Sequence, residues 1–294
     1  MGVVYNGIMG LVVGDALGVP YEFRPRDSFT ATDMIGYGTH NQPAGTWSDD
    51  SSMALATLRS IGQHGKIDPD DIMFLFSQWL NMGNFTPYDK VFDVGGATRR
   101  AVQRYSELNI PPLNCGGGKV TDNGNGALMR ILPVVFVSHS DVDVVKVAKL
   151  THAHYISNSA CCAYIEIAEK LLSGKGKREI MQTIKDRDDI MPIEFSRLTN
   201  LENLSRDEIK SSGYVVDTLE AALWCILKTD NYRDCVLTAV NLGEDTDTTA
   251  AVAGGLAGLI YGCGGTRGIP DEWIKQIPKR HWIADLCEVV EHIH

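Results

Sequence analysis

The sequence predicts an all-α protein. Apolar residues recur at helical spacing along most of the 294 residues, and no segment alternates between apolar and polar residues over the length of a strand. The chain is long enough to bury a large core, and its 44% of hydrophobic residues are enough to form one. We therefore expect a single compact domain over residues 1–294.

The first helices have readable boundaries. A helix over residues 6–17 ends where Gly and Pro follow it, and residues 24–47 are expected to form an irregular loop rich in Gly, Thr and Pro. A second helix over 48–65 carries apolar residues at helical spacing. The third begins with Asp68 as N-cap and Pro69 at the first helical position, followed by acidic residues that favour a helix start.

The rest of the chain continues in the same pattern. We expect further helices over residues 94–107, 125–137, 141–151, 157–173, 176–186, 214–228, 231–242 and 247–261, with one or two short helices within 271–293. Residues 108–124 and 188–212 are the long irregular stretches. Neither resembles a linker, because the apolar helical pattern resumes unchanged after each.

Composition excludes several classes of protein. The formal net charge of −10 argues against a general nucleic-acid binder. No run of the sequence approaches the length needed to span a membrane, the longest apolar stretches being 131–137 and 250–260, and the first twenty residues lack the basic region of a signal peptide. The seven cysteines have neither disulfide-like nor zinc-like spacing, which is typical of a reducing compartment. We expect a cytoplasmic protein.

Two acidic clusters stand directly before apolar helices. The first is Ser-Asp-Asp-Ser at 48–51, and the second is Glu-Asp-Thr-Asp-Thr-Thr at 244–249. Helix capping explains one Asp or Ser at each place, since these residues stabilise helix starts. It does not explain two carboxylates and several hydroxyls in each cluster. Brought together, these carboxylates would repel one another unless a cation neutralised them.

The ligand types indicate which cation. Carboxylate and hydroxyl oxygens are hard donors, and neither cluster contains Cys or His, so Mg²⁺ or Mn²⁺ fits better than Zn²⁺ or copper. A site built from clusters this far apart in sequence requires the first and last helical parts to meet in one core.

Seven segments in order carry a resemblance to a known family. They are Gly-Asp-Ala-Leu-Gly at 14–18 with Glu22 after it, and the segments at 47–51, 92–100, 124–130, 151–152, 213–220 and 243–248. In these segments the chain resembles the ADP-ribosylglycohydrolase family. The resemblance implies an all-α fold with a binuclear Mg²⁺ or Mn²⁺ centre, two ions per chain, at the bottom of a cleft. It also implies hydrolysis of the bond between ADP-ribose and an acceptor.

Carried over residue by residue, the resemblance implies six metal ligands. They are Ser48, Asp49, Asp50, Asp245, Asp247 and Thr248. The family commonly has Thr where this chain has Ser48, and Ser keeps the hydroxyl that ligates.

Two further acids are implied as catalytic residues. Taken alone, Glu22 is a loop carboxylate exposed to solvent, and Asp93 is an N-cap for the helix that follows it. The resemblance makes both candidates for the metal cleft, with Asp93 favoured as general base or ribose-ring catalyst. The Phe-Asp-x-Gly-x-x-Thr-Arg pattern around Asp93 resembles the arginine-directed bacterial branch.

Substrate contacts are implied elsewhere. Glycine before a helix start lets backbone N–H groups approach a phosphate, although an ordinary Asn-Gly turn has the same composition. The resemblance makes candidates of Gly124, Asn125, Gly126, Met129, His152 and Tyr214. For His152 and Tyr214 the simpler alternative is a place in the core.

The expected partner is an ADP-ribosylated protein, or a small molecule that contains ADP-ribose. The preferred bond is the N-glycosidic bond of ADP-ribosylarginine. O-linked ADP-ribose, on serine or as O-acetyl-ADP-ribose, is the alternative within the hydrolases. A metal-dependent ADP-ribose binding module without catalysis is the alternative from another class, and the intact ligand set argues against it.

Overall fold

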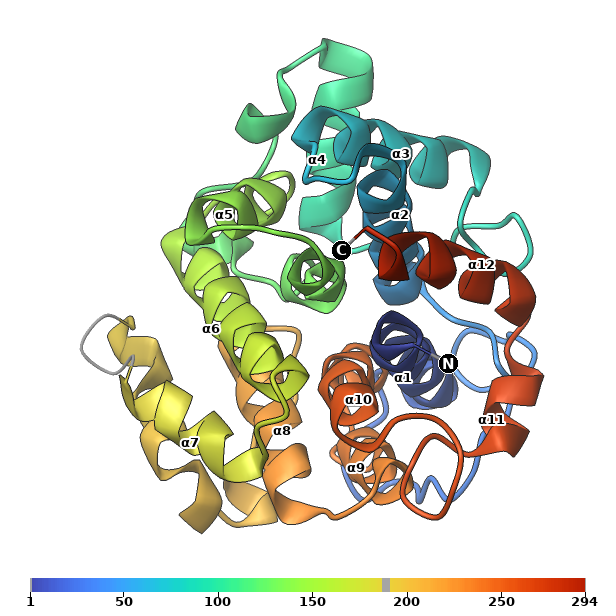
Figure 1. The fold of residues 1–294 in the computed structure, drawn as a ribbon, viewed down its shortest axis with the longest axis vertical. Helices are drawn as coiled ribbons and strands as arrows, with labels where there is room; N and C mark the ends of the chain where they lie inside the picture. Colours follow the sequence, from blue (N-terminus) through green and yellow to red (C-terminus); the bar gives the residue numbers. More distant parts are fainter. Residues whose placement is uncertain (1, 187–190, 294) are drawn as a thin grey trace.

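The structure is a computed structural model that describes residues 2–186 and 191–293. Its α-helices are α1 (Val3–Gly18), α2 (Asp49–His64), α3 (Pro69–Met82), α4 (Gly96–Leu108), α5 (Asp141–Lys149), α6 (Tyr155–Leu172), α7 (Lys177–Asp186), α8 (Val215–Lys228), α9 (Tyr232–Val240), α10 (Thr246–Tyr261), α11 (Asp271–Gln276) and α12 (Arg280–Glu291) (Figure 1). In the described ranges there are isolated β-bridges and no strand. The predicted all-α fold class is confirmed.

Helices α1 and α10 pack with their backbones almost in contact. A Cβ added at Gly10 would lie 2.3 Å from the carbonyl oxygen of Gly254, and one at Gly14 would lie 2.1 Å from that of Ala250. Real Cβ atoms do not approach other atoms this closely, so only glycine permits the crossing. Figure 1 shows the two helices side by side near the middle of the molecule. The contact places the C-terminal end of α1 beside the start of α10, where a Cβ added at Gly18 would lie 2.3 Å from the Cα of Asp247.

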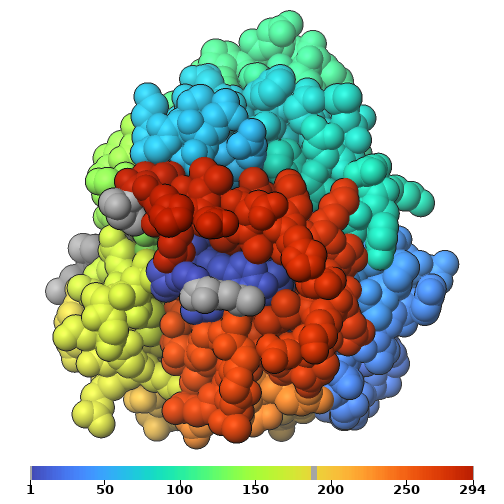
Figure 2. Space-filling view, turned by 45° about the vertical axis from the view of Figure 1, so that its right-hand side comes forward, coloured from blue at the N-terminus to red at the C-terminus, as the bar shows by residue number. Residues whose placement is uncertain are grey.

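The C-terminal helix covers the start of the chain. In α12, Glu291 accepts hydrogen bonds from the backbone N–H groups of Val3 (3.0 Å) and Val4 (2.9 Å). These N–H groups lie in the first turn of α1, where a helix has no internal acceptors for them. The space-filling view shows the red C-terminal residues passing beside the blue N-terminal segment (Figure 2). Helix α12 also packs against α2 and so joins the first and second helices.

Several predicted helix boundaries are confirmed. The side chain of Asp68 accepts hydrogen bonds from the backbone N–H groups of Asp70 (3.1 Å) and Asp71 (3.2 Å), which makes it the N-cap of α3. Helix α2 ends at Gly65, in the left-handed conformation that glycine adopts without strain. The other predicted helices lie within a few residues of the observed ones, apart from one segment.

The predicted α-helix over 125–137 is wrong. The structure has two short 3-10 helices there, η4 (Leu128–Arg130) and η5 (Leu132–Phe136). Pro133 is the physical reason: it has no N–H to donate, and its ring clashes with the carbonyl group four residues earlier in an α-helix. Residues 124–126 consequently precede a short 3-10 turn and not an α-helix.

The two stretches expected to be irregular contain short 3-10 helices. Residues 108–124 include η2 (Pro112–Asn114) and η3 (Val120–Asp122). In the second stretch, residues 188–190 lie outside the described ranges, and the remainder includes η6 (Ile193–Asn203) and η7 (Arg206–Glu208). A 3-10 helix, η1 (Val19–Tyr21), also follows α1 directly.

One segment, Val3–Tyr21, is long and apolar enough to cross a membrane by length and composition. The expectation that no run of the sequence approaches this length is therefore wrong. In the structure 89% of this segment is buried inside the protein, where it packs against α10 and α12. Its apolar character is accounted for by its place at the centre of the core.

Candidate metal and substrate site

The two acidic clusters meet. Ser48 is the N-cap of α2, and the second cluster begins α10. The hydroxyl of Thr248 donates a hydrogen bond of 3.1 Å to a carboxylate oxygen of Asp50. The first and last helical parts therefore share one core, as the clusters predicted. The Ser48 hydroxyl accepts from the backbone N–H of Asp50 at 3.3 Å, so it caps the helix.

Asp15 is a site residue that the sequence analysis did not assign. It is fully buried in α1, and its carboxylate accepts hydrogen bonds from the backbone N–H groups of Ser48 (2.9 Å) and Ser51 (3.0 Å). The Ser51 hydroxyl donates to it as well, at 2.5 Å. A carboxylate from α1 thus satisfies the free N–H groups at the start of α2 and fixes the first cluster in place.

Carboxylates crowd together beneath the pocket. One oxygen each of Asp15, Asp50 and Asp247 lie within 4.8 Å of one another, and so do oxygens of Glu22, Asp245 and Asp247. Burial, and then the neighbouring carboxylates, raise the pKa values of Asp50 and Asp247 well above their usual range. Burial raises the pKa of Asp15 to about 6, against the opposing effect of the hydrogen bonds from Ser51 and Ser48.

Several of these oxygens have no partner among the described residues. Both carboxylate oxygens of Asp247, Oδ2 of Asp50 and Oδ1 of Asp245 are buried without a hydrogen bond. Buried polar atoms in proteins are otherwise nearly always paired. Unpaired carboxylate oxygens that face one another are the arrangement that hard divalent cations fill. The donor set therefore fits Mg²⁺ or Mn²⁺, and Asp247, common to both groups, lies at its centre.

Asp49 lies on another side of the pocket. It is 7% exposed, and it receives a hydrogen bond from the backbone of Gly95 at the start of α4. Burial and the charge of Asp93 raise its pKa well above the usual range. Asp49 does not belong to the close carboxylate groups around Asp247, and its predicted role as a ligand stays a prediction.

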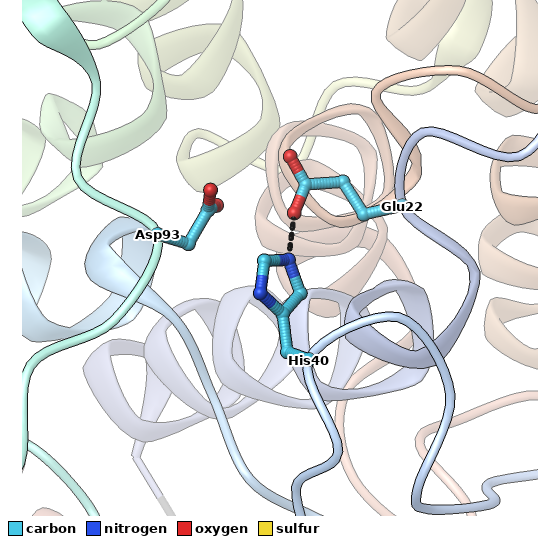
Figure 3. Close-up of side chains that lie close together, drawn as sticks. All are labelled: Glu22, His40 and Asp93. Atoms are coloured by element: carbon cyan, nitrogen blue, oxygen red, sulfur yellow. Dashed lines mark hydrogen bonds and ion pairs between the residues drawn. The ribbon is translucent and has the colours of Figure 1, made fainter.

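The side chains of Glu22, Asp93 and His40 point toward one another, with one ligand atom of each within 4.8 Å of the others (Figure 3). Glu22 is only 5% exposed, and its carboxylate is hydrogen-bonded to Nε2 of His40. Burial raises the pKa of Glu22 to about 8, against the opposing effect of His40. The hydrogen bond that His40 donates to Glu22 in turn raises the pKa of His40. Glu22 is therefore a buried site carboxylate and not a solvated loop charge.

The local backbone explains how these residues reach the site. Glu22 follows η1 directly, and the next residue, Phe23, donates its backbone N–H to the carbonyl of Glu244 at 2.7 Å. This bond ties the loop to the second acidic cluster. Asp93 has a φ of 49° and does not cap α4, whose N-cap is Gly95. Its carboxylate is thereby left free to face Glu22 and His40.

The predicted phosphate segment forms another wall. The side-chain amide of Asn125 donates to Asp245 at 2.8 Å and to Thr218 at 2.9 Å, so Asn125 links this wall to the metal cluster. Because the segment opens only a 3-10 turn, the predicted α-helix N-terminus is absent. Gly126 instead lies against His152: a Cβ there would come 2.8 Å from the imidazole Cε1.

These walls enclose a pocket of about 370 Å³. Of the predicted residues, those that line it are Glu22, Asp49, Asp93, Gly124, Asn125, Gly126, Met129, His152, Asp245 and Thr248. Ser48, Asp50 and Asp247 are buried and Tyr214 is half-buried, all outside the lining. Tyr214 forms the N-cap position of α8, next to the lining residue Gly213. Its predicted stacking on adenine stays a prediction.

Fold and site together define a class: an all-helical protein with a buried cluster of carboxylates that could hold cations, at one side of a ligand-sized pocket. The chain belongs to the ADP-ribosylglycohydrolase family, whose model matches residues 4–294. The resemblance stated from the sequence is confirmed.

Named relatives cover nearly the whole chain. ADP-ribosylarginine hydrolase Tri1 of Pseudomonas putida (strain GB-1) is 33% identical over 292 residues, which span 96% of this chain and 76% of that protein. ADP-ribosyl-[dinitrogen reductase] glycohydrolase of Rhodospirillum rubrum is 32% identical over 285 residues, covering 92% and 89%. A solved structure described as an ADP-ribosylglycohydrolase-related protein complex matches with a TM-score of 0.84 at 30% identity, covering 99% and 97%.

Proposed function

We propose that the protein is a metal-dependent hydrolase that removes ADP-ribose from ADP-ribosylarginine side chains. The observation that carries the proposal is Asp247: both of its carboxylate oxygens are buried and unpaired, between Asp50 on one side and Glu22 and Asp245 on the other. Membership of the ADP-ribosylglycohydrolase family supports this reaction class. The name of the Pseudomonas putida relative, ADP-ribosylarginine hydrolase, supports the arginine acceptor.

Two cations, Mg²⁺ or Mn²⁺, fit the site. The carboxylates of Asp50, Asp245 and Asp247 would hold them, with Thr248 as a neighbouring hydroxyl donor. When bound, such cations lower the pKa of a bound water and attract the vicinal hydroxyls of a ribose. They would also offset the repulsion between a chain of net charge −10 and a dianionic diphosphate.

The chain's own carboxylates act on the sugar. Cleavage of a glycosidic bond builds positive charge on the anomeric carbon and its ring oxygen. Glu22 and Asp93 lie on the same side of the pocket, so both can stabilise that charge, and one of them can take the proton of the attacking water. The bond from His40 fixes the orientation of the Glu22 carboxylate.

The charge distribution of the pocket supports a cationic acceptor. Glu22 and Asp93 form an acidic wall beside the ring of Phe23, which is 66% exposed. The wall at Gly124, Gly126 and His152 carries no acidic side chain. A diphosphate is repelled by the first wall and accommodated by the second, whereas a guanidinium is attracted by the carboxylates and by an aromatic face. A serine acceptor gains nothing from the acidic wall.

Partners and location follow from the same proposal. The substrate is an ADP-ribosylated protein or a small molecule that contains ADP-ribose, and the acidic surface argues against nucleic acid. A cytoplasmic location is supported by the seven cysteines, all of which are free and six of which are buried.

The experiment measures release of free ADP-ribose from an arginine-ADP-ribosylated protein and, in parallel, from a serine-modified peptide. Each reaction is run with Mg²⁺, with Mn²⁺ and with a chelator. Metal-dependent release from the arginine substrate alone supports the proposal. Release only from the serine peptide moves the protein to the O-linked alternative. Tight ADP-ribose binding without release from either substrate identifies a binding module.

A further inference from the structure

A charged side chain lies buried behind the neutral wall of the pocket. Arg130, the last residue of η4, is 0% exposed, and its guanidinium lies 4.7 Å from the centre of the Phe76 ring. Burial lowers the pKa of Arg130 to about 10, so it stays charged at neutral pH. No carboxylate pairs with it among the described residues. A buried charge without a counter-charge is costly, and the mechanism above does not use it.

The partners of Arg130 lead to the pocket. Its Nη2 lies 2.6 Å from the hydroxyl oxygen of Thr151, and the same oxygen lies 2.7 Å from Nδ1 of His152. A guanidinium can only donate hydrogen bonds. The Thr151 oxygen therefore accepts from Arg130, and its own O–H is left to donate to Nδ1 of His152. With Nδ1 as acceptor, the neutral imidazole carries its proton on Nε2.

The opposite tautomer fits the surroundings poorly. A proton on Nδ1 would point at an oxygen that already accepts from Arg130, and the buried Thr151 O–H would have no recorded acceptor in the described part of the chain. The Nδ1–H group of this tautomer would also direct its partial positive charge toward the Arg130 guanidinium. Protonation of both nitrogens is disfavoured too, because burial and the charge of Arg130 lower the pKa of His152 to about 3.

Nε2 of His152 faces the pocket. A Cβ added at Gly124 would lie 3.5 Å from this nitrogen, and one at Gly126 would lie 3.4 Å from it. His152 lines the pocket, and in the described residues no partner is recorded for Nε2. A neutral N–H donor with a fixed direction and a positive charge behind it suits an anionic oxygen.

We propose that Arg130 and Thr151 are positioning residues that hold His152 as the Nε2–H tautomer, so that it donates to a phosphate oxygen of the ligand. This inference rests on the proposed function only in taking ADP-ribose as that ligand. The geometry of the chain Arg130–Thr151–His152 is independent of the reaction and of the acceptor.

The test begins with nitrogen–proton correlation spectra of the metal-loaded protein carrying ¹⁵N-labelled histidine, with His152 assigned from H152Q. The expected spectrum is that of a neutral imidazole protonated at Nε2. The variants are T151V, which removes both hydrogen bonds at constant shape, and T151S, which keeps the hydroxyl. Thr57→Val is the matched control, because the buried Thr57 hydroxyl donates only within its own helix, to Met53 at 2.9 Å.

We expect T151V to lose the single tautomer and to bind ADP-ribose about 10- to 100-fold more weakly, the scale of one hydrogen bond to a charged group. T151S and T57V should match the wild type in both measurements. A wild-type spectrum with the proton on Nδ1 overturns the inference even if T151V does not fold. So does a folded T151V that keeps both the tautomer and the affinity. A wild type that binds ADP-ribose but releases none from arginine rejects the proposed function alone.

Discussion

The hydroxyl of Ser51 donates a hydrogen bond of 2.5 Å to the carboxylate of Asp15, and both residues are completely buried. The bond joins the last turn of α1 to the first turn of α2. Because the neighbouring residues of that turn are Asp49 and Asp50, the position of the candidate metal ligands depends on a residue that is not predicted to bind the metal.

We expect Asp15→Ala to weaken both folding and metal binding. It leaves the buried N–H groups of Ser48 and Ser51 and the Ser51 hydroxyl without their acceptor, at roughly 1–3 kcal/mol for each group. Metal affinity should fall about 10- to 100-fold, as when an orienting partner of a ligand is lost. Urea denaturation and Mn²⁺ titration measure the two effects.

The control for Asp15→Ala is Ser52→Ala. The Ser52 hydroxyl lies in the same helical turn but donates to the Ser48 carbonyl at 2.7 Å and does not contact Asp15. Its loss should change the free energy of unfolding by less than about 1 kcal/mol and leave the Mn²⁺ affinity unchanged. Equal behaviour of the two variants would remove Asp15 from the support of the site.

Asp247→Asn should raise the stability of the metal-free protein and abolish its metal-dependent activity. Without cations, burial and the charges of Glu22 and Asp50 disfavour the ionised form of the Asp247 carboxyl group. An amide of the same shape removes that repulsion, so the chelated variant should melt at a higher temperature than the chelated wild type at pH 8. It should bind Mn²⁺ poorly and lose metal-dependent turnover. Normal turnover by this variant would disprove the metal-centre assignment.

The metal-free protein should lose stability as the pH rises from 6.5 to 8.5. The pKa of Glu22 is raised to about 8 in the folded protein, so the folded state keeps a proton that the unfolded chain has already released. This contribution is complete below the unfolded pKa of about 4.5 and is lost as the pH rises through 8. Asp15, whose pKa is raised to about 6, completes its loss at lower pH.

His152 has the opposite sign and a different window. Its pKa is lowered to about 3, so its contribution is present above the unfolded value of about 6.5 and is lost as the pH falls below that value. Melting temperatures in chelator at pH 6.5 and 8.5 therefore avoid most of the His152 effect, and the decline between them comes from the buried carboxylates and from His40, whose pKa is raised. Added Mg²⁺ or Mn²⁺ should abolish the decline, and Glu22→Gln should reduce it. A chelated protein that is equally stable at both values contradicts the prediction.

Gly126→Ala should weaken ligand binding without unfolding the protein. The new methyl group would lie 2.8 Å from Cε1 of His152 and 2.9 Å from the hydroxyl of Thr98, so it must displace one pocket wall. We expect ADP-ribose affinity to fall about tenfold or more, by calorimetry, since even modest misplacement of binding groups is costly. Gly118→Ala, whose methyl group meets no atom within 4 Å, is the control and should bind normally.

The sequence predicted the helices well where periodicity alone decides them. It also predicted that the two acidic clusters meet, because helix capping accounts for only one acidic or hydroxyl residue in each cluster and a shared cation accounts for the others. The prediction of an α-helix over 125–137 is wrong because the apolar run contains Pro133, and a proline inside such a run interrupts an α-helix.

Two site residues could not be assigned from local pattern. Asp15 lies within an apolar helix, where a single acid has no spacing signal, and its role depends on contact with Ser48 and Ser51. The only available sign was a charged residue on a helix that is otherwise buried. His40 lies in a loop without periodicity, and only the fold places it against Glu22 and near Asp93.

The packing of α1 has a consequence for synthesis on the ribosome. The first helix to emerge is almost wholly apolar, and its glycine-lined face fits α10, which is completed only at Tyr261. At ordinary rates of translation the nascent chain carries that face unpaired for roughly 10–50 s. Glu291 is synthesised later still, and its carboxylate accepts the hydrogen bonds of the first turn of α1. The nascent α1 is therefore a segment that we expect molecular chaperones to bind until α10 has been made.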